Sequence, residues 1–144
     1  VREVVSIPVV ANGEVWTSED HHRCCDISNC SDVMLGRGAV ADPFLARRIR
    51  QRIAGGTPAI DRAVDWQQLC SLLAIFWQGL RNKVYAPHAP GRLKLWLNAL
   101  RRTFIEAETL FFVIRPLRRV DEVERMLLDH GVPLLSPAPL SRQH

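Results

Sequence analysis

Two short apolar runs, each ended by a glycine turn and followed by a helical pattern, most constrain what this chain can fold into. The first run, 7–11, ends at Asn12-Gly13, and the second, 32–35, ends at Gly36. Continuous apolarity without alternation, as in the first run, is typical of a strand buried on both faces of a parallel sheet. We therefore predict a β-α-β-α unit whose two strands run parallel.

Helix start signals follow both runs. Thr17 with Asp20 three residues later approximates a capping box and predicts a helix to about Asn29. Asp42-Pro43 has the pattern of an N-cap followed by proline at the first helical position, which predicts a helix through Arg52.

Two parallel strands alone leave both outer edges unpaired and their faces half covered. We therefore expect the first fifty or so residues to close a larger α/β sheet or barrel whose beginning is absent from this chain. The sequence lacks an initiator Met and opens inside what resembles a helix end running into a strand, Val1 to Val10, so we expect a piece of a longer protein. It shows no secretory signal.

A linker-like break, Gly55-Gly56-Thr57-Pro58, separates this part from a purely helical pattern. Apolar residues recur every three or four positions from Trp66 to Leu80, and again from Leu93 to Ile114. The second stripe predicts one helix of roughly 35 Å. We place Trp66, Trp77 and Trp96 in the core.

Proline and glycine residues mark the ends of these helices. Pro87, Pro90 and Gly91 predict the turn between the two stripes, and Pro116 ends the second helix. A third helix is expected to open at Asp121 with Glu124 and to close at Gly131, before an irregular tail.

The composition narrows the functional classes. The net charge is +4, and all of the excess lies in residues 61–144, which fits a polyanionic partner. No apolar segment is long enough to span a bilayer, so we exclude a transmembrane protein. The four cysteines contain no CxxC pair and match no disulfide scaffold, which favours free thiols in a reducing cytoplasm.

The segments directly after the two strands are the first candidate site. In a parallel α/β barrel, successive strand C-termini open on the same face, where ligands bind. Glycine lets the backbone approach a phosphate, a helix N-terminus near Pro43 adds N–H groups, and Arg37 is suited to bidentate phosphate contacts. Asn-Gly and Gly-Arg-Gly are also common in plain turns, so spacing alone leaves both interpretations open.

A basic stripe in the helical part is the second candidate site. Lys94, Asn98, Arg101 and Arg102 fall at helical spacing opposite the apolar stripe, where they would follow a phosphate backbone or form an ordinary solvated face. Arg118 and Arg119 near a helix end are explained by its dipole.

Cysteine and histidine residues near the start suggest a metal site only weakly. His21 and Cys25 stand four residues apart, a workable ligand pair, but zinc sites usually use separated pairs on turns. We expect no metal, and we interpret Cys25 and Cys30 as small buried packing residues.

The order of motifs resembles the C-terminal part of the tRNA-dihydrouridine synthases. IPVVANGEV is followed by DVMLGRGA and a proline-bearing helix. Further on, GRLKLWL, EAETLF and VIR are similar to the subfamily called tRNA-dihydrouridine synthase C. The chain departs from that subfamily at Leu95, where glutamine is usual.

The resemblance implies an α/β fold: the C-terminal part of a (β/α)8 TIM barrel followed by an all-α helical bundle domain. Residues 1–54 would form the last two β/α units of this flavin-binding barrel, 55–62 a linker, 63–131 a tRNA-binding helical domain, and 132–144 an irregular tail. The implied enzyme is a cytoplasmic oxidoreductase that uses NADPH and FMN to reduce uridine to 5,6-dihydrouridine in the tRNA D-loop, at position 16.

The resemblance also assigns roles to single residues. Positions that hold FMN, mostly near its phosphate, fall on Asn12, Gly13, Glu14, Gly36 and Arg37. Positions that contact tRNA fall on Arg92, Lys94 and Arg115.

The family's catalytic cysteine, a general acid, belongs to the missing N-terminal half of the barrel. None of Cys24, Cys25, Cys30 and Cys70 stands in the matching motif, so we expect no catalytic residue in this chain and no activity from it alone. Two other interpretations stay open: a non-catalytic RNA-binding helical module, and another FMN-dependent TIM-barrel oxidoreductase acting on a small molecule.

Overall fold

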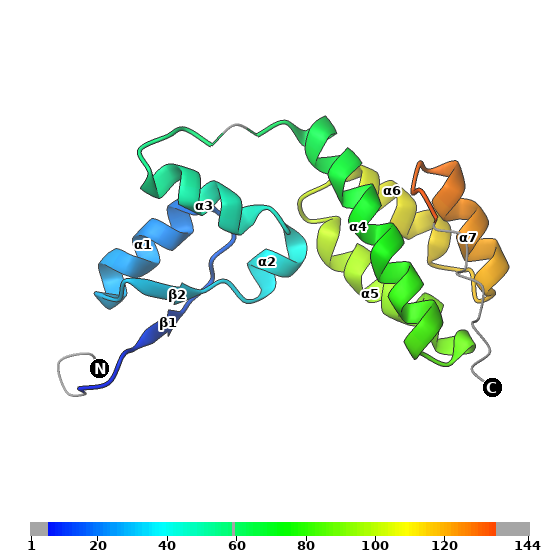
Figure 1. The fold of residues 1–144 in the computed structure, drawn as a ribbon, viewed down its shortest axis with the longest axis horizontal. Coiled ribbons are helices and arrows are strands. Elements are labelled where there is room, and N and C mark those ends of the chain that lie inside the picture. Colours follow the sequence, from blue (N-terminus) through cyan, green and yellow to red (C-terminus); the bar gives the residue numbers. More distant parts are fainter. Residues whose placement is uncertain (1–5, 59, 135–144) are drawn as a thin grey trace, which may run out of the picture. The chain divides into compact units, whose positions relative to one another are not determined.

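The computed structural model describes residues 6–58 and 60–134. The chain forms two compact units, Val1–Asp61, here called the strand unit, and Arg62–His144, here called the helical unit (Figure 1). The tail expected from 132 onwards lies largely outside the described residues. Within the described part, no helix combines the length and the apolar character that crossing a membrane requires.

The strand unit contains a two-stranded parallel sheet. Strand β1 spans Val10–Asn12 and strand β2 spans Asp32–Met34, with Ala11 opposite Val33. The prediction of a parallel pair is confirmed, although both strands are shorter than the apolar runs that suggested them.

Helix α1, Ser18–Ser28, connects the two strands. Thr17 caps it, because its hydroxyl accepts from the Asp20 amide at 3.1 Å while the Asp20 carboxylate accepts from the Thr17 amide at 3.0 Å. The helix closes at Asn29, whose φ of 51° is left-handed. The predicted capping box and helix end are both confirmed.

After β2 the structure differs from the sequence-based expectation. A short helix that was not predicted, α2, spans Arg37–Ala41. The helix predicted through Arg52 is confirmed as α3, Leu45–Ile53, but it begins at Leu45 and not at Pro43. The Asp42 carboxylate instead accepts from the Phe44 amide at 3.0 Å and forms a buried ion pair with Arg48. Asp42 therefore stabilises the turn between two helices.

One side of the sheet is covered and the other is not. Helices α1 and α3 lie over the same side of the strands, with Val15, Leu45 and Ile49 buried at the centre of the packing (Figure 1). In contrast, Val10 is 58% exposed and Met34 is 55% exposed. The expectation of strands buried on both faces is therefore not met within the described residues of the strand unit, whose helices α1 and α3 cover one side of the sheet.

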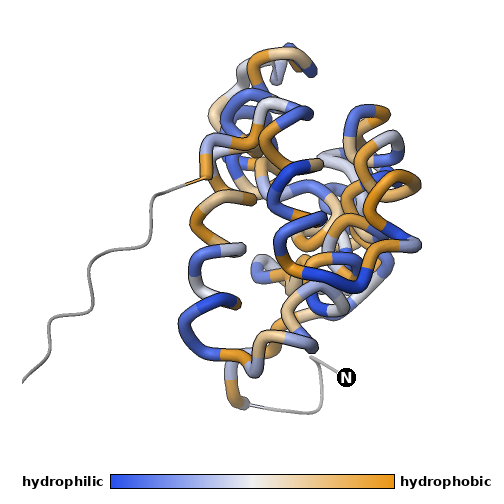
Figure 2. The backbone as a smooth tube through the Cα atoms, turned by 90° about the vertical axis from the view of Figure 1, so that its right-hand side faces the viewer, coloured by the Kyte–Doolittle hydropathy of each residue, from blue (hydrophilic) through white to orange (hydrophobic). Residues whose placement is uncertain are grey.

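The described residues of the helical unit form four α-helices and one turn of 3-10 helix. These are α4 (Arg62–Lys83), η1 (Ala86–His88), α5 (Ala89–Leu100), α6 (Ile105–Ile114) and α7 (Val120–Asp129). Helix α5 contacts α4, α6 and α7. Apolar and polar residues alternate within the turns of the helices in Figure 2. The unit buries an apolar core that includes Leu69, Leu73, Trp77, Leu93, Leu97, Leu100, Phe104, Ala107, Leu110, Ile114, Val123 and Leu127.

The single long helix predicted over the second stripe is broken, and this prediction was wrong. Helix α5 ends at Leu100, whose carbonyl oxygen accepts from the amides of both Thr103 and Phe104 at 2.9 Å. Phe104 then takes an extended backbone and is 1% exposed, while Arg101 lies over the Phe111 ring at 5.1 Å. Phe104 is thus a buried residue at the start of α6.

The other predicted helix ends are confirmed only in part. Pro90 and Gly91 lie in the first turn of α5 and not in a loop, because proline is tolerated where the amide needs no partner. Pro116 follows the end of α6, and Gly131 with a φ of 80° closes α7, as expected. Trp77 is buried, whereas Trp66 and Trp96 are only half-buried at the edge of the core.

Candidate functional site

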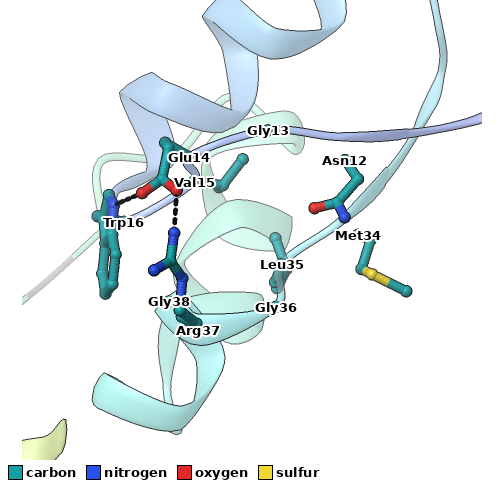
Figure 3. Close-up of a pocket in the computed structure, with 10 residues that line it drawn as sticks. All are labelled: Asn12, Gly13, Glu14, Val15, Trp16, Met34, Leu35, Gly36, Arg37 and Gly38. Carbon is teal, nitrogen blue, oxygen red and sulfur yellow. Dashed lines mark hydrogen bonds and ion pairs between the residues drawn. The ribbon is translucent and has the colours of Figure 1, made fainter.

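The segments that follow β1 and β2 line one pocket of about 360 Å³, formed by residues 12–16 and 34–38 (Figure 3). Because the strands are parallel and Asn12 pairs with Met34, both segments leave the sheet at the same end. The expectation that these two segments meet at one opening is confirmed.

Close main-chain contact holds the two segments together. A Cβ atom added to Gly38 would lie 1.9 Å from the carbonyl oxygen of Val15, so only glycine fits there. Gly36 has a φ of 52° and a ψ of −125°, a conformation that side chains strongly disfavour. Two of the three positions 36–38 therefore need glycine for backbone reasons.

Arg37, the predicted phosphate ligand, is already engaged with two neighbours (Figure 3). Its guanidinium donates to Oε1 of Glu14, and Oε2 of the same carboxylate accepts from the indole Nε1 of Trp16 at 2.9 Å. The Arg37 Cζ atom lies 5.9 Å from the centre of the Trp16 ring, within cation-π range. Arg37 is still 75% exposed along its side chain, so most of its donors remain accessible.

The helix expected to support this site is a different one. Pro43 and the start of α3 do not line the pocket, whereas Arg37 is itself the first residue of α2. The predicted contribution of a helix N-terminus near Pro43 was therefore wrong. Local polarity comes instead from the Arg37 guanidinium, the Asn12 amide and the main chain around Gly36.

These groups are better suited to bind an anionic group such as phosphate than an apolar ligand. A guanidinium with free N–H groups and an unhindered glycine main chain match phosphate oxygens, and nothing lies within 4 Å of a Cβ built on Gly36. The Glu14 carboxylate repels an anion, but its charge is opposed by Arg37. The five residues predicted here all line the pocket, and the chemistry fits a phosphate group at its Arg37 side.

In the helical unit, the structure brings some of the predicted basic residues together. Nζ of Lys94 donates to the carbonyl oxygen of Leu117 at 2.5 Å, which ties α5 to the turn between α6 and α7. Burial lowers the pKa of Lys94, and the nearby charge of Arg118 lowers it further. Arg115, at the end of α6, is exposed in the same turn.

Arg92 lies on a different side of α5 from Lys94. It is exposed on α5 two residues before Lys94, and residues two apart on a helix point to different sides. The predicted stripe through Arg101 and Arg102 is also wrong, because α5 ends at Leu100 and both lie in the turn beyond it.

Two residues that lie at these candidate sites were not predicted from the sequence. Arg118 was assigned to a helix dipole, yet it lies beside Lys94 and precedes the positive N-terminal end of α7, where a dipole does not favour a cation. Its position three residues after Arg115 was the available signal. Trp16, which lines the pocket and binds Glu14, carried no signal beyond its nearness to Asn12-Gly13-Glu14.

None of the cysteines is among the residues that line the pocket, although the Cys24 Sγ atom would lie 3.1 Å from a Cβ atom built on Gly13. Cys30 is buried, and Cys70 is buried in the helical unit, where burial raises the pKa of its thiol. Cys25 is only half-buried, so its prediction as a buried residue was wrong; its Sγ lies 4.0 Å from both ring nitrogens of His21. Among the described residues, no group of three potential ligands gathers around a metal position.

Comparison with known proteins places these features in context. Residues 1–105 match the family described as dihydrouridine synthase. The chain is 46% identical over 127 residues to a tRNA-dihydrouridine(16) synthase of Aquipseudomonas alcaligenes, a match covering 88% of the chain and 39% of that protein. It is 41% identical over 139 residues to the protein of the same name from Cupriavidus necator, covering 96% and 41% respectively. The chain therefore spans about two-fifths of the length of these curated relatives.

Proposed function

The chain belongs to the dihydrouridine synthase family, and we propose that it supplies the closing part of the flavin-binding barrel and the RNA-binding domain of a tRNA-dihydrouridine synthase. The observation that carries this proposal is the pocket shared by the two segments after β1 and β2, with Arg37 at its edge. The proposed reaction is the reduction of uridine to 5,6-dihydrouridine in tRNA, which assigns the protein to the cytoplasm.

The proposed cofactor is FMN, with its phosphate at the Arg37 side of the pocket. Arg37 would supply charged N–H donors, the Gly36 main chain would allow close approach, and Asn12 and Gly13 would line the opposite wall. In this proposal the chemistry that FMN would supply when bound is hydride transfer to uridine, with NADPH as the reductant. The residues of this chain bind and orient the anionic end of the cofactor.

The exposed side of the sheet supports the proposal of a complete barrel. Val10 and Met34 are apolar and exposed on strands whose outer edges pair with no described residue. In a (β/α)8 barrel, such side chains are covered by further strands, and barrel ligands bind at the C-terminal strand ends, where this pocket lies. We propose that these further strands come from an N-terminal half outside this chain.

The proposed tRNA contacts are Arg92, Lys94 and Arg115, to which we add Arg118. Cations near phosphates release counterions, which gives RNA affinity a steep dependence on salt. Arg115 and Arg118 are exposed and form no ion pair with any described residue, so they are available for phosphate oxygens. Since the relatives named above carry position 16 in their names, we propose that this uridine is the one reduced.

This chain would perform no catalysis alone. The proposed general acid is a cysteine outside the chain. None of the four cysteines here is exposed, and burial raises the pKa of the Cys25 and Cys70 thiols, the opposite of what marks a reactive thiol. The test is to delete the complete gene in its host and map dihydrouridine in the tRNA by mass spectrometry. Loss of dihydrouridine at position 16 supports the proposal, whereas unchanged tRNA with an RNA-binding product favours the non-catalytic module.

A further inference from the structure

The Glu14 carboxylate has a different partner on each of its oxygens. Oε1 accepts from the guanidinium of Arg37, and Oε2 accepts from the indole of Trp16 at 2.9 Å. Figure 3 shows these three side chains together on one side of the pocket, with Glu14 contacting both Trp16 and Arg37 and with Asn12 and Met34 on the other side. The carboxylate is therefore fixed in orientation, and it fixes one end of the Arg37 side chain.

Removal of Glu14 could either strengthen or weaken the binding of a phosphate group. A carboxylate close to a phosphate site repels the phosphate, so its removal would tighten binding if charge alone mattered. A carboxylate that anchors the arginine does the opposite, because an unanchored exposed arginine samples many rotamers and must be ordered again when ligand binds.

Magnitudes decide between these effects. Ordering a free arginine side chain weakens binding by up to roughly thirtyfold. Two unit charges ~8 Å apart in water alter an equilibrium by only about twofold, and salt reduces this further. Glu14 and Arg37 are both mostly exposed, so the screened value applies here. Anchoring outweighs repulsion.

We propose that Glu14, held by Trp16, is a positioning residue that orients Arg37 for the phosphate of FMN and does not itself bind the cofactor. This inference rests on the proposed function. Because a guanidinium carries five N–H groups, the contact with Glu14 leaves others to face the ligand. The Arg37 side chain is thus restricted to a few conformations at the pocket before the ligand binds.

The experiment is a flavin titration of the complete apoenzyme, followed by flavin fluorescence at low and at high salt. Glu14→Gln removes the charge and weakens the bond to Arg37, whereas Glu14→Asp keeps the charge but withdraws it by one methylene group. We expect both variants to bind FMN about three- to tenfold more weakly, and Trp16→Phe to show a smaller loss in the same direction.

Three controls separate positioning from general damage. Riboflavin lacks the phosphate, so its affinity should stay within about twofold of wild type in every variant. Glu19→Gln breaks another exposed ion pair of the same unit, between Glu19 and Arg52, and should leave FMN binding unchanged. In an Arg37→Ala background, Glu14→Gln should cause no further loss.

The outcomes are distinct. If Glu14→Gln binds FMN as tightly as wild type or more tightly, Glu14 acts by charge or not at all, and the positioning role is overturned while the proposed function stands. The positioning role is equally overturned if FMN and riboflavin weaken together. If the wild-type complete protein binds neither flavin, both the proposed function and this inference fail.

Discussion

The helical unit closes its own hydrophobic core, whereas the strand unit leaves one side of its sheet open. Leu93, Leu97 and Leu110 are fully buried in the first, while Val10 and Met34 are more than half exposed in the second. Burial of apolar surface is the dominant driving force of folding, so intrinsic stability should concentrate in the helical unit. The residues that form the candidate phosphate site thus lie on the part that depends more on neighbours.

The sharpest way to break this comparison is to produce the two units separately. We expect 62–144 to unfold cooperatively on heating and 1–61 to show no cooperative transition, because the latter has too little buried apolar surface to offset its conformational entropy. Circular dichroism melting and amide hydrogen exchange measure both. A cooperative transition of 1–61 alone would show that its open sheet face needs no cover.

Paired truncations in the two units should differ in their cost to stability. Leu97→Ala removes a fully buried side chain and should lower the free energy of unfolding of the helical unit by about 3 kcal/mol. Met34→Ala, at a half-exposed position, should cost less than about 0.5 kcal/mol in this chain. Urea unfolding with a constant m-value checks both, and comparable losses would contradict the comparison.

Substitution of Arg37 tests the strand unit at its site. In the complete enzyme, Arg37→Ala should weaken FMN binding by about ten- to a hundredfold, because a charge-assisted hydrogen bond is lost. Flavin occupancy after gel filtration is the readout. Arg23→Ala, which breaks an exposed pair with Asp20 on α1, is the matched control and should keep its flavin. Full occupancy in Arg37→Ala would refute the assignment.

Substitution of Lys94 tests the helical unit at its site. Lys94→Glu should weaken tRNA binding about tenfold while flavin reduction by NADPH is unchanged, since it reverses a charge and releases the turn at Leu117. In filter binding, the slope of the logarithm of the tRNA binding constant against the logarithm of the salt concentration should fall in magnitude by about one. Lys83→Glu at the end of α4 carries the same charge change and is the control. Equal loss of tRNA binding and flavin reduction would indicate misfolding instead.

The smallest expected effect concerns pH. The Arg119 guanidinium donates to both carboxylate oxygens of Asp121, at 3.1 and 3.0 Å, and lowers the pKa of that carboxyl. Since the folded pKa lies below the unfolded value of about 3.9, this contribution to stability is present above about pH 4 and is lost as pH falls through the folded pKa.

Melting temperatures of 62–144 measured from about pH 6 to about pH 3 test this sign. Asp121→Asn should reduce the decrease in melting temperature at acid pH. Asp129→Asn, at an exposed carboxylate at the end of the same helix, should not. An unchanged profile in Asp121→Asn would show that the ion pair adds nothing to stability, as many exposed pairs do.

The sequence predicted features that depend on local signals. The parallel strand pair, the Thr17 capping box and the opening shared by Gly13 and Arg37 follow from turn residues and strand direction. The break after Leu100 was not predictable from the apolar stripe, because Leu97, Leu100 and Phe104 keep the same spacing in a continuous helix. At the break the amides of Thr103 and Phe104 both donate to the Leu100 carbonyl oxygen, an arrangement that the apolar pattern does not specify.

The candidate site was predictable in its members but not in its connections. Asn12 to Glu14 and Gly36 to Arg37 could be named from the strand ends, but no local rule joins Glu14 to an arginine 23 positions further along the chain. Helix α2 escaped prediction because it is only five residues long and contains Gly38, a poor helix former. Its place is set by contact with Val15, not by its own helix propensity.

The contact between Gly38 and the Val15 carbonyl has a consequence for how this region tolerates change. Because the backbones of two segments touch there, the spacing of the pocket walls is determined by the polypeptide itself and not by the size of any side chain. Mutations of side chains in the strands or covering helices can therefore accumulate without changing the width of the pocket. A single methyl group at position 38, in contrast, would force its two walls apart.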